Sequence, residues 1–523
     1  MKAIHPVRIC VPICEDSLDA AKEASARAFD LADLIELRLD CLDTVDVRHA
    51  LSEMLELLHR VGKPAIVTYR PAEQGGRRAL SHERRYEFWS DMAQADQVAG
   101  GFLDLELDIV ERFASQDASS LSPLDWTRVI CSKHDFGGAP ADLVQTYDQM
   151  ARTPARILKI AVQAEDLTDC LPVFQLLDRA CAEKREMIAI AMGTSGFATR
   201  ILAPSRGAFL TYGALGNESA TAPGQISASE LRTLYRIGNI SRQTQIMGLV
   251  GLPVAHSISP HMHNLALESV GCDGVYIPFE VRDSASFLRR MIHPRTREIE
   301  WNIRGLSVTA PHKSAVMSCL DWIEPAAKEI GAVNTIVVEG DELHGYNTDA
   351  PAFTNTLNAR IGELRNARCA VIGAGGVASA VLWGLKQRQA NVTLYARDVE
   401  KAKSLADKFG ARWAALNSAR FEGFDVVINA TTLGTWGPQE NATPATASQL
   451  GSTRLAYDLV YNPEETRFLC EARAAGCDVL GGLAMLVTQA AEQFRLWIGA
   501  EAPAEIMHDA ATKALESVKM ATR

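Results

Sequence analysis

The sequence predicts an α/β protein in which a (β/α)8 barrel precedes a two-lobed α/β half with a Rossmann nucleotide-binding lobe. In the first half, eight short β-rich runs alternate with amphipathic helical patterns, which is typical of parallel βα units. After a polar segment, a new βα pattern begins near residue 246. A glycine-rich turn at 373–376 then follows one strand and opens a helix, which favours nucleotide binding.

The length of 523 residues predicts several domains, because single hydrophobic cores stop growing at about 250 to 300 residues. The barrel is expected at 1–240, where the eight runs are 7–13, 34–39, 65–69, 102–107, 128–132, 156–161, 187–191 and 209–212. The second half is expected as a first lobe at 244–348, a Rossmann lobe at 349–482 and C-terminal helices at 483–523 that return to the first lobe.

The composition excludes several classes of protein. A hydrophobic content of 47% with 22% charged residues is typical of globular domains, and no apolar run is long enough to span a membrane. The N-terminal residues show no signal-peptide pattern, so we expect a cytoplasmic location. The net charge of -11 argues against a nucleic-acid partner and favours small-molecule ligands. Eleven cysteines without Cys-x-x-Cys spacing predict reduced thiols and no metal site.

Polar residues follow the barrel strands, at the end where such barrels carry their chemistry. Glu36, Arg38 and Asp40 alternate along one strand, and therefore share a face. Lys159 lies within an apolar strand, where burial disfavours the charged form and makes the amine a nucleophile for carbonyls. The alternative is a lysine that extends out of the barrel mouth into solvent. His134, on the preceding strand, favours the nucleophile.

These motifs resemble the type I 3-dehydroquinate dehydratases. The matching segments are 36–40, 68–70 with Gly75-Gly76, 132–136, Lys159, 192–200 and 222–225. The resemblance implies that Lys159 forms a Schiff base with the substrate ketone, while His134 removes and relays protons. It also implies a set of substrate-binding residues, namely Glu36, Arg38, Arg70, Arg200, Thr221 and Gln225.

Two positions depart from that family pattern. Thr221 stands where a serine is expected, and keeps a hydroxyl. Gln74 stands where many members have a glutamate near the catalytic histidine. Either Glu73 substitutes for that glutamate, or a neutral amide suffices.

The second half opens on the stretch 251–264, in which two serines are spaced for ligand binding. Ser257 and Ser259 would point to the same side of an extended segment, where both hydroxyls could bind a carboxylate. Pro260 permits a helix to begin directly afterwards. The alternative is a Ser/Pro turn with a serine helix cap.

A lysine and an aspartate in the same half could act as a proton-transfer pair. Lys313 follows a strand expected at 303–309, and Asp349 precedes a helix containing Pro351. Taken singly, Lys313 could be a surface residue and Asp349 an N-cap. Together at a cleft, they can move a proton to or from an alcohol.

The Rossmann signature predicts the cofactor. A strand leads into Gly373, Ala374, Gly375, Gly376, Val377 and Ala378, and a second strand is expected at 391–395. Where an NAD enzyme carries an acidic residue on the ribose, Arg397 is found, and a guanidinium suits a 2′-phosphate. We therefore expect NADP, although Asp398 follows directly and leaves NAD open as an alternative.

Residues 246–500 resemble shikimate dehydrogenase, a two-lobed α/β dehydrogenase. The matching segments are 256–260, 308–313, 331–335, 347–349, 373–376, 429–432, 461–463 and 485–489. By this resemblance Lys313 and Asp349 transfer protons, and Thr431 joins the glycine turn at the cofactor. The substrate would be bound by Asp349 together with Ser257, Ser259, Thr309, Asn334, Tyr461 and Gln489.

The tandem order resembles plant bifunctional dehydratase-dehydrogenases, and predicts a shikimate-pathway enzyme with two activities. The barrel would dehydrate 3-dehydroquinate through a Schiff base, and the second half would reduce 3-dehydroshikimate with NADPH. Two alternatives stay open: a second half that oxidises quinate, and a transcriptional regulator that has kept both folds. Retention of Lys159, His134, Lys313 and Asp349 favours the enzyme. We expect a monomer or a weak homodimer.

Overall fold

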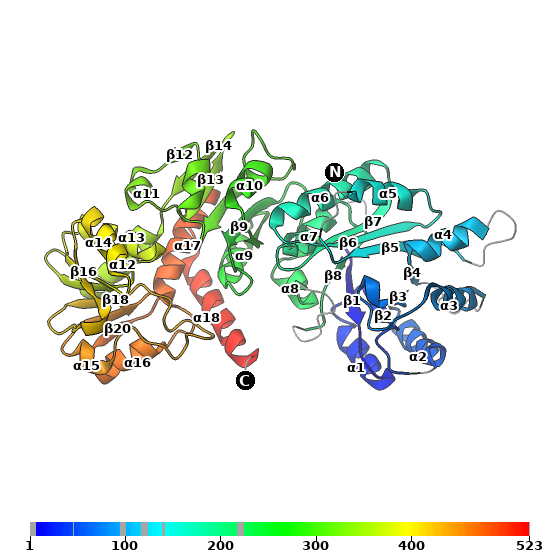
Figure 1. The fold of residues 1–523 in the computed structure, drawn as a ribbon, viewed down its shortest axis with the longest axis horizontal. Helices are drawn as coiled ribbons and strands as arrows, with labels where there is room; N and C mark the ends of the chain where they lie inside the picture. Colours follow the sequence, from blue (N-terminus) through cyan, green and yellow to red (C-terminus); the bar gives the residue numbers. More distant parts are fainter. Residues whose placement is uncertain are drawn as a thin grey trace. The chain divides into compact units, whose positions relative to one another are not determined.

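The computed structural model describes residues 7–44, 46–94, 101–116, 124–138, 142–216 and 224–521 (Figure 1). The chain divides into two compact units. One comprises Met1–Thr244 with Ile277–Met291 and Glu298–Asn302, and the other comprises Gln245–Tyr276, Ile292–Arg297 and Ile303–Arg523. Within the described ranges, no helix has the length and apolar character needed to cross a membrane.

The first unit contains an eight-stranded parallel sheet in the order β7-β6-β5-β4-β3-β2-β1-β8. Its strands are β1 (Ile9–Ile13), β2 (Leu34–Arg38), β3 (Ala65–Thr68), β4 (Phe102–Glu106), β5 (Val129–Asp135), β6 (Ile157–Gln163), β7 (Glu186–Met192) and β8 (Thr211–Tyr212). Just before β8, the backbone N–H of Phe209 donates to the carbonyl of Met187 on β7 over 2.7 Å, which brings the ring almost to closure. The predicted barrel is confirmed.

Helices cover the outside of the barrel (Figure 1). They are α1 (Leu18–Ala28), α2 (Val47–Arg60), α3 (His82–Gln94), α4 (Leu107–Gln116), α5 (Leu143–Ala151), α6 (Cys170–Ala182), α7 (Phe197–Leu202) and α8 (Ala228–Thr233). The helix α1 shows why they form: Ser17 caps its first turn, and Ala21, Ala24 and Ala28 make a buried stripe at helical spacing.

The barrel interior is apolar at one end and polar at the other. An apolar cluster fills it with side chains from β1 to β3, β5 to β8 and the segment that leads into β8, namely Cys10, Leu34, Ile66, Ile130, Ile157, Ile188, Ile190, Phe209, Leu210 and Tyr212. Buried polar and charged side chains occupy the strands as well, namely Glu36, Thr68, Asp104, Glu106, Ser132 and Lys159. A buried charge needs partners, so this polar layer must be internally paired.

The second half of the chain begins with a six-stranded mixed sheet in the order β10-β9-β11-β13-β14-β12. Its strands are β9 (Gln245–Gly251), β10 (Gly274–Glu280), β11 (Ile303–Val308), β12 (Trp322–Ile323), β13 (Thr335–Glu339) and β14 (Glu342–Tyr346). The helices α9 (Ser259–Ser269), α10 (Ser284–Phe287) and α11 (Pro325–Ile330) accompany it. The helix α10 ends at Phe287 and passes directly into a π-helix at Leu288–Ile292.

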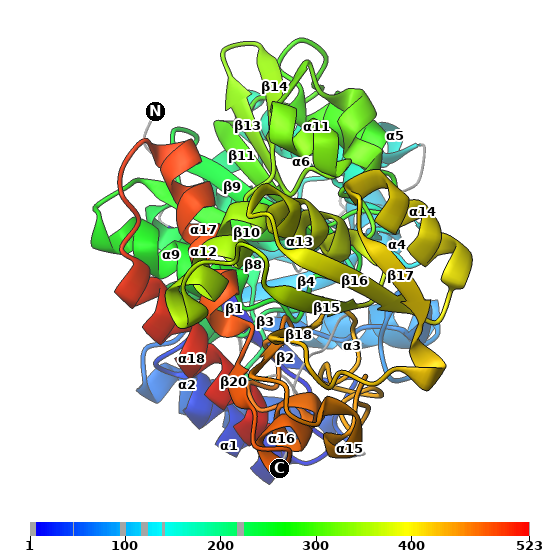
Figure 2. The same ribbon diagram turned by 90° about the vertical axis from the view of Figure 1, so that its left-hand side faces the viewer.

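A second six-stranded sheet is entirely parallel, in the order β17-β16-β15-β18-β19-β20, and faces the viewer in Figure 2. Its strands are β15 (Arg368–Ile372), β16 (Asn391–Ala396), β17 (Arg412–Ala415), β18 (Val426–Asn429), β19 (Leu455–Asp458) and β20 (Asp478–Leu480). The helices are α12 (Asp349–Ile361), α13 (Gly376–Gln387), α14 (Val399–Phe409), α15 (Ala447–Leu450) and α16 (Arg467–Ala474). The predicted Rossmann lobe is confirmed.

The chain ends in two long helices, α17 (Leu483–Ile498) and α18 (Ala504–Ala521), drawn in red in Figure 2. Their apolar residues, among them Val487, Phe494 and Met507, join one core with Met247 of β9 and Met262 of α9. These helices therefore pack against the first lobe of the second unit, although the Rossmann lobe lies between them in the sequence.

Candidate active sites

The barrel contains a partly open cavity that is lined by charged and apolar side chains. Its lining includes seven of the residues singled out from the sequence, namely Glu36, Arg38, Arg70, His134, Lys159, Arg200 and Gln225. Gln74, Gly75, Phe136, Ala161, Ile190, Met192 and Tyr212 complete the lining. Thr221 lies outside the described residues. A few converging polar groups among apolar side chains are typical of a site for a small molecule.

Lys159 is buried in this cavity and is held by three oxygen atoms. Its Nζ lies 2.8 Å from Oδ2 of Asp104, 2.8 Å from Oη of Tyr212 and 3.4 Å from Oε1 of Glu36. The alternative of a lysine that extends into solvent is therefore wrong. Burial alone would raise the pKa of Asp104, but the charges of Arg70 and Lys159 bring the pKa of that carboxyl well below its usual range.

Arg70 is fixed by acidic neighbours rather than presented alone to a ligand. Its guanidinium lies 2.7 Å from Oδ1 of Asp104 and 2.7 Å from Oε1 of Glu106, and donates to Oγ of Ser132 over 2.7 Å. Burial by itself would lower the pKa of Arg70, but Asp104 and Glu106 raise it above its ordinary value. Arg70 thus keeps its charge and holds Asp104 toward Lys159.

His134 is placed to act as a neutral base. Its Nδ1 is buried with no hydrogen-bond partner in the described part of the chain. Burial lowers the pKa of His134 well below its ordinary value, and the positive charges of Arg70 and Lys159 act in the same direction. Its backbone N–H donates to Oε1 of Gln74 over 3.0 Å.

The contact between Gln74 and His134 bears on the departure noted in the sequence. Gln74 supports the backbone of His134, and lines the cavity beside it. Glu73 is exposed and is not among the lining residues, so it does not take the place of the missing glutamate. The amide oxygen of Gln74 satisfies a backbone donor without adding a negative charge to the cavity.

Two further arginines reach the cavity with different surroundings. Arg200, on α7, is 1% exposed, and burial lowers its pKa to about 10. Arg38 forms a two-pronged pair with Asp40, at 2.9 Å from Nε and 2.8 Å from Nη2, and also donates to the carbonyl of Gly75 over 3.1 Å. A guanidinium at the cavity wall suits an anionic carboxylate.

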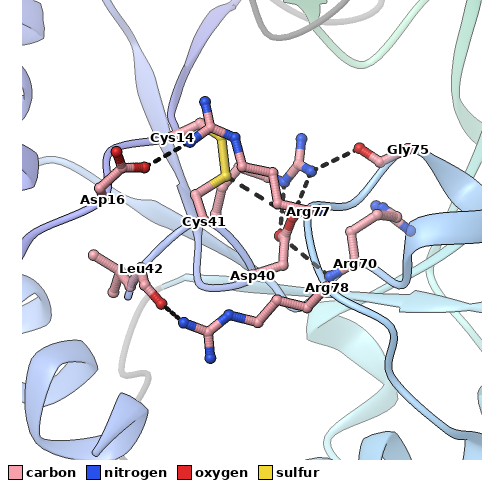
Figure 3. Close-up of a disulfide and its surroundings, with 10 residues drawn as sticks. Cys14, Asp16, Asp40, Cys41, Leu42, Arg70, Gly75, Arg77 and Arg78 are labelled. Atoms are coloured by element: carbon pink, nitrogen blue, oxygen red, sulfur yellow. Dashed lines mark hydrogen bonds and ion pairs between the residues drawn. A yellow bond between two sulfur atoms is a disulfide. The ribbon is translucent and has the colours of Figure 1, made fainter. Parts of the chain in front are cut away.

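A disulfide joins Cys14 to Cys41 beside this pair, with 5.2 Å between the Cα atoms (Figure 3). The expectation that all eleven cysteines are reduced thiols is therefore wrong for these two, while the other nine are free. The two cysteines are 27 residues apart, so no short spacing announces them. They meet because they follow β1 and β2, which are adjacent parallel strands.

Asp40, next to Cys41, ties the surrounding loops together. Besides Arg38, its carboxylate accepts from the backbone N–H groups of Arg70 at 3.3 Å and Arg77 at 3.1 Å, as Figure 3 shows. Burial alone would raise the pKa of Asp40, but the hydrogen bonds and charge of Arg38 lower it below its ordinary value. The disulfide thus lies next to the hydrogen bonds of Asp40, which position Arg38 at the cavity wall.

In the second unit, Lys313 and Asp349 form an ion pair. Nζ of Lys313 lies 2.6 Å from Oδ2 of Asp349, and their side chains are only 20% and 9% exposed. A surface role for Lys313 is therefore wrong. Asp349 is the first residue of α12 rather than its cap, which is Thr348. Nδ2 of Asn334 donates to Oδ1 of Asp349 over 2.9 Å, and lies 3.4 Å from Oε1 of Gln489.

The serine pair adopts a turn instead of the expected extended segment. Ile258 has helical backbone angles, and Ser259 is already the first residue of α9, followed by Pro260. Oγ of Ser257 accepts from the backbone N–H of Ser259 over 3.2 Å and donates to its Oγ over 3.2 Å. The two hydroxyls still converge. They do so because a helix begins at Ser259, and not because alternate residues of a strand share a face.

Thr309 and Tyr461 each follow a strand. The backbone N–H of Thr309 donates to Val250 over 2.8 Å, so it continues the pairing of β11 with β9. A Cβ atom at Gly251 would lie 2.3 Å from Cγ2 of Thr309, which explains the glycine there. Tyr461 follows β19, and burial raises the pKa of its phenol.

Gln493 was not singled out from the sequence, yet it is buried beside this site. Its Nε2 donates to the carbonyl of Asn334 over 3.2 Å, and its Oε1 accepts from Ser307 over 2.8 Å. Ser307 in turn accepts from the phenol of Tyr276 over 2.8 Å. The signal was available, because Gln493 lies one helical turn after Gln489 on the same face of α17.

The glycine turn of the Rossmann lobe leaves room for a ligand. Gly373 has a φ of +110°, and a Cβ atom there would lie 2.8 Å from the carbonyl oxygen of Ala430. At the start of α13, a Cβ atom added to Gly375 or to Gly376 would have no atom beyond its neighbouring residues within 4 Å. The N–H groups of a helix N-terminus bind phosphate, so this open space fits a dinucleotide.

Two other predicted cofactor residues, Arg397 and Thr431, follow strands of the same sheet. Arg397 follows β16 and is exposed, while Asp398 caps α14 by accepting from the backbone N–H of Lys401 over 3.0 Å. The carboxylate of Asp398 is thus engaged with the helix, which favours Arg397 as the group that meets the ribose. Thr431 is fixed next to Gly373 by donating from Oγ1 to Oδ1 of Asn429 over 2.6 Å.

Family models match both halves of the chain. The model described as type I 3-dehydroquinase matches residues 9–242. The shikimate dehydrogenase substrate binding domain matches 249–336, the shikimate / quinate 5-dehydrogenase model matches 356–456, and the shikimate 5'-dehydrogenase C-terminal domain matches 482–512.

Individual relatives show the same division. The NADP(+) shikimate dehydrogenase of Methanococcus aeolicus is 37% identical over 281 residues, which are 52% of this chain and 98% of the relative. A crystal structure of a shikimate dehydrogenase in complex with NADP+ covers 53% of this chain and 97% of its own, with 34% identity and a TM-score of 0.50. The chloroplastic bifunctional 3-dehydroquinate dehydratase/shikimate dehydrogenase of Arabidopsis thaliana is 32% identical, over 96% of this chain and 84% of the relative. The chain therefore belongs to the family of bifunctional 3-dehydroquinate dehydratase/shikimate dehydrogenases.

Proposed function

We propose that the barrel dehydrates 3-dehydroquinate to 3-dehydroshikimate and that the second half reduces this product to shikimate with NADPH. The observation that carries the proposal is a buried lysine, Lys159, in a barrel cavity that also holds a neutral histidine, His134. The second half adds a paired Lys313 and Asp349 and an open glycine turn for a dinucleotide.

In the barrel, Arg200 binds the ring carboxylate and Lys159 attacks the ketone. Loss of water from the resulting carbinolamine leaves an iminium, which acidifies the neighbouring C–H bond. His134, neutral because of its lowered pKa, takes this proton. The electron pair forms the ring double bond and expels the hydroxyl on the next carbon, which leaves as water with the proton from His134. Hydrolysis of the imine then frees Lys159.

In the second half, Lys313 and Asp349 hold the proton for the reduction. NADPH, when bound, would supply a hydride to the ketone carbon. The ammonium of Lys313 can give a proton to the ketone oxygen, and Asp349 orients that ammonium from 2.6 Å. Asn334, which donates to Asp349, and the converging hydroxyls of Ser257 and Ser259 form the polar surface that receives the substrate. Thr309, Tyr461 and Gln489 complete the proposed set.

The dinucleotide is held by the segment 373–378, with Thr431 beside it and Arg397 at the 2′-phosphate. The first lobe of the second half is proposed at 244–348, the Rossmann lobe at 349–482 and the returning helices at 483–523. The ligands of the whole chain are small molecules, namely 3-dehydroquinate, 3-dehydroshikimate, shikimate and NADP(H).

Borohydride trapping tests the barrel chemistry. Reduction in the presence of 3-dehydroquinate should attach the ligand covalently to Lys159, and mass spectrometry of the peptide that contains Lys159 would show the added mass. His134→Ala should still trap, while its turnover falls by about 10²- to 10⁴-fold, the usual loss for a general base. A sample that binds ligand but shows no adduct at Lys159 would refute the Schiff base and favour a ligand-sensing regulator.

A further inference from the structure

Tyr212 is the one uncharged partner of Lys159 Nζ within the described residues. It lies on β8, lines the cavity, and its Oη is 2.8 Å from Nζ. The other two partners, Asp104 at 2.8 Å and Glu36 at 3.4 Å, are both acidic side chains. The sequence motifs do not include Tyr212, because its contact with Lys159 depends on the closure of the barrel.

Three acceptors around Nζ match the three N–H groups of an ammonium. To attack a ketone, the lysine must lose one proton, which leaves two N–H groups and a lone pair. The contacts with Asp104 and Tyr212 are shorter than the contact with Glu36, so these two hydrogen bonds are the ones retained. The lone pair then points where the third N–H pointed, toward Glu36 and the cavity that Glu36 lines.

A phenol suits this place better than a carboxylate or an apolar ring. A third carboxylate would favour the ammonium over the amine, whereas a neutral phenol accepts the hydrogen bond without adding charge. Burial raises the pKa of Tyr212 well above its ordinary value, and the charge of Glu36 acts in the same direction, so the phenol stays neutral. A phenylalanine would leave a buried N–H group of Lys159 without an acceptor.

The ring of Tyr212 is also held firmly in place. Tyr212 is in register with Cys10 of β1, and the neighbouring Thr211 donates to the carbonyl of Arg200 over 2.8 Å. Nζ of Lys159 lies 4.5 Å from the ring centroid, so the aromatic face and the hydroxyl both bound the space around the amine.

We propose that Tyr212 is a positioning residue of the dehydratase, which together with Asp104 orients the neutral amine of Lys159 so that its lone pair faces the substrate ketone. This inference rests on the proposed Schiff base at Lys159. It assigns Tyr212 to the step in which the carbon–nitrogen bond forms, and not to substrate binding.

The test compares Tyr212→Phe with Tyr147→Phe. Tyr147 is a buried tyrosine of the same barrel, whose hydroxyl donates to Glu183 over 2.6 Å and which does not line the cavity. Each variant therefore loses one hydrogen-bonded hydroxyl from the barrel. The measurements are kcat and KM of the dehydratase, and the rate at which borohydride traps the ligand on Lys159 in a single turnover. The NADPH-dependent reduction of 3-dehydroshikimate by the same chain serves as the folding control.

Tyr212→Phe should lower both kcat and the trapping rate by about 2- to 10-fold, the effect of one lost hydrogen bond between neutral groups, with little change in KM. Tyr147→Phe should leave both unchanged. Tyr212→Gln returns a neutral acceptor and should recover part of the trapping rate, and it serves as the second variant if Tyr212→Phe folds poorly.

Three outcomes decide the matter. Wild-type trapping and kcat in Tyr212→Phe would overturn the inference and leave the Schiff base intact. A rise in KM as large as the fall in kcat would make Tyr212 a substrate ligand, and would also overturn it. An absence of any adduct in the wild-type chain would instead refute the proposed function of Lys159, whatever Tyr212 does.

Discussion

At the scale of single residues, Arg70 and Lys159, two buried cations of the barrel cavity, are paired with buried carboxylates. Arg70 is surrounded by Asp104 and Glu106, so it holds acidic groups in place while Asp104 holds Lys159. His134 stands near these cations, and its Nδ1 has no hydrogen-bond partner in the described residues. One arrangement therefore gives a charged arginine, an oriented lysine and a neutral histidine.

The neutral state of His134 predicts the pH dependence of the dehydratase. Because the pKa of His134 in the folded chain is lowered, the imidazole is still unprotonated at the ordinary histidine pKa of about 6.5. The value of kcat/KM for 3-dehydroquinate should thus stay level as the pH falls through that value, and decline only through the lowered pKa. An acid limb centred on the ordinary value, and absent in His134→Ala, would contradict this.

Arg397 should determine the choice of cofactor. Its exposed guanidinium lies where a 2′-phosphate is expected, and a hydrogen bond to a charged group is worth about 1.5 to 3 kcal/mol. Arg397→Ala should therefore lower kcat/KM for NADPH by about 10- to 100-fold and leave the value for NADH nearly unchanged. Arg388→Ala, at the other end of α13, is the matched control. Equal losses with both cofactors would count against the assignment.

Many of these residues could be predicted from local motifs. The others depend on contacts between residues that are far apart in the sequence. Lys159 stands out because a cation interrupts an apolar strand, and Glu36 because it alternates with Arg38. Asp104 and Glu106 carry the same alternation on β4, a pattern from which both residues could have been predicted. Tyr212 meets Lys159 only once the barrel closes, and no spacing within the sequence reports that contact.

At the scale of elements, the helix boundaries and the pairing of strands explain the serine pair, the edge strands and the disulfide, which sequence patterns did not predict. The helix α9 begins at Ser259, so strand alternation could not describe the serine pair. The strands β17 and β20 are short edge strands of the Rossmann sheet, without long apolar runs. Cys14 and Cys41 became partners because β1 and β2 are adjacent and both cysteines follow their strands.

The disulfide should stabilise the barrel through the loop that it closes. A closed loop of 27 residues corresponds to about 3.5 kcal/mol of unfolding free energy in the chain-entropy estimate. Replacing both cysteines by serine should therefore lower the denaturation midpoint of the barrel, followed by loss of dehydratase activity in urea. Cys470→Ser, at an exposed free cysteine, is the control. A double variant as stable as the control would mean that the bond contributes nothing.

At the scale of the whole molecule, the two sets of site residues lie in separate units with their own cores. Separate cores allow one site to be removed without the other. Lys313→Ala should abolish the reductase and keep the dehydratase, and Lys159→Ala should do the reverse, each measured by its own assay. If either variant, still folded, lost both activities, the two units would not be independent.

The large-scale organisation was accessible from the sequence, because alternating strand and helix patterns and a polar segment near residue 240 mark two halves. The return of α17 and α18 to the first lobe is harder to predict from the sequence. Their apolar faces show that they pack, and only the shared core with Met247 and Met262 shows where.

The central claim is that one chain carries two consecutive reactions, and a coupled assay tests it most directly. The purified chain is supplied with 3-dehydroquinate and NADPH, and the absorbance of NADPH is followed while shikimate is quantified. We predict that NADPH is consumed and that shikimate accumulates in equal amount, with no other enzyme added. A chain that consumes NADPH with 3-dehydroshikimate but not with 3-dehydroquinate would contradict the account.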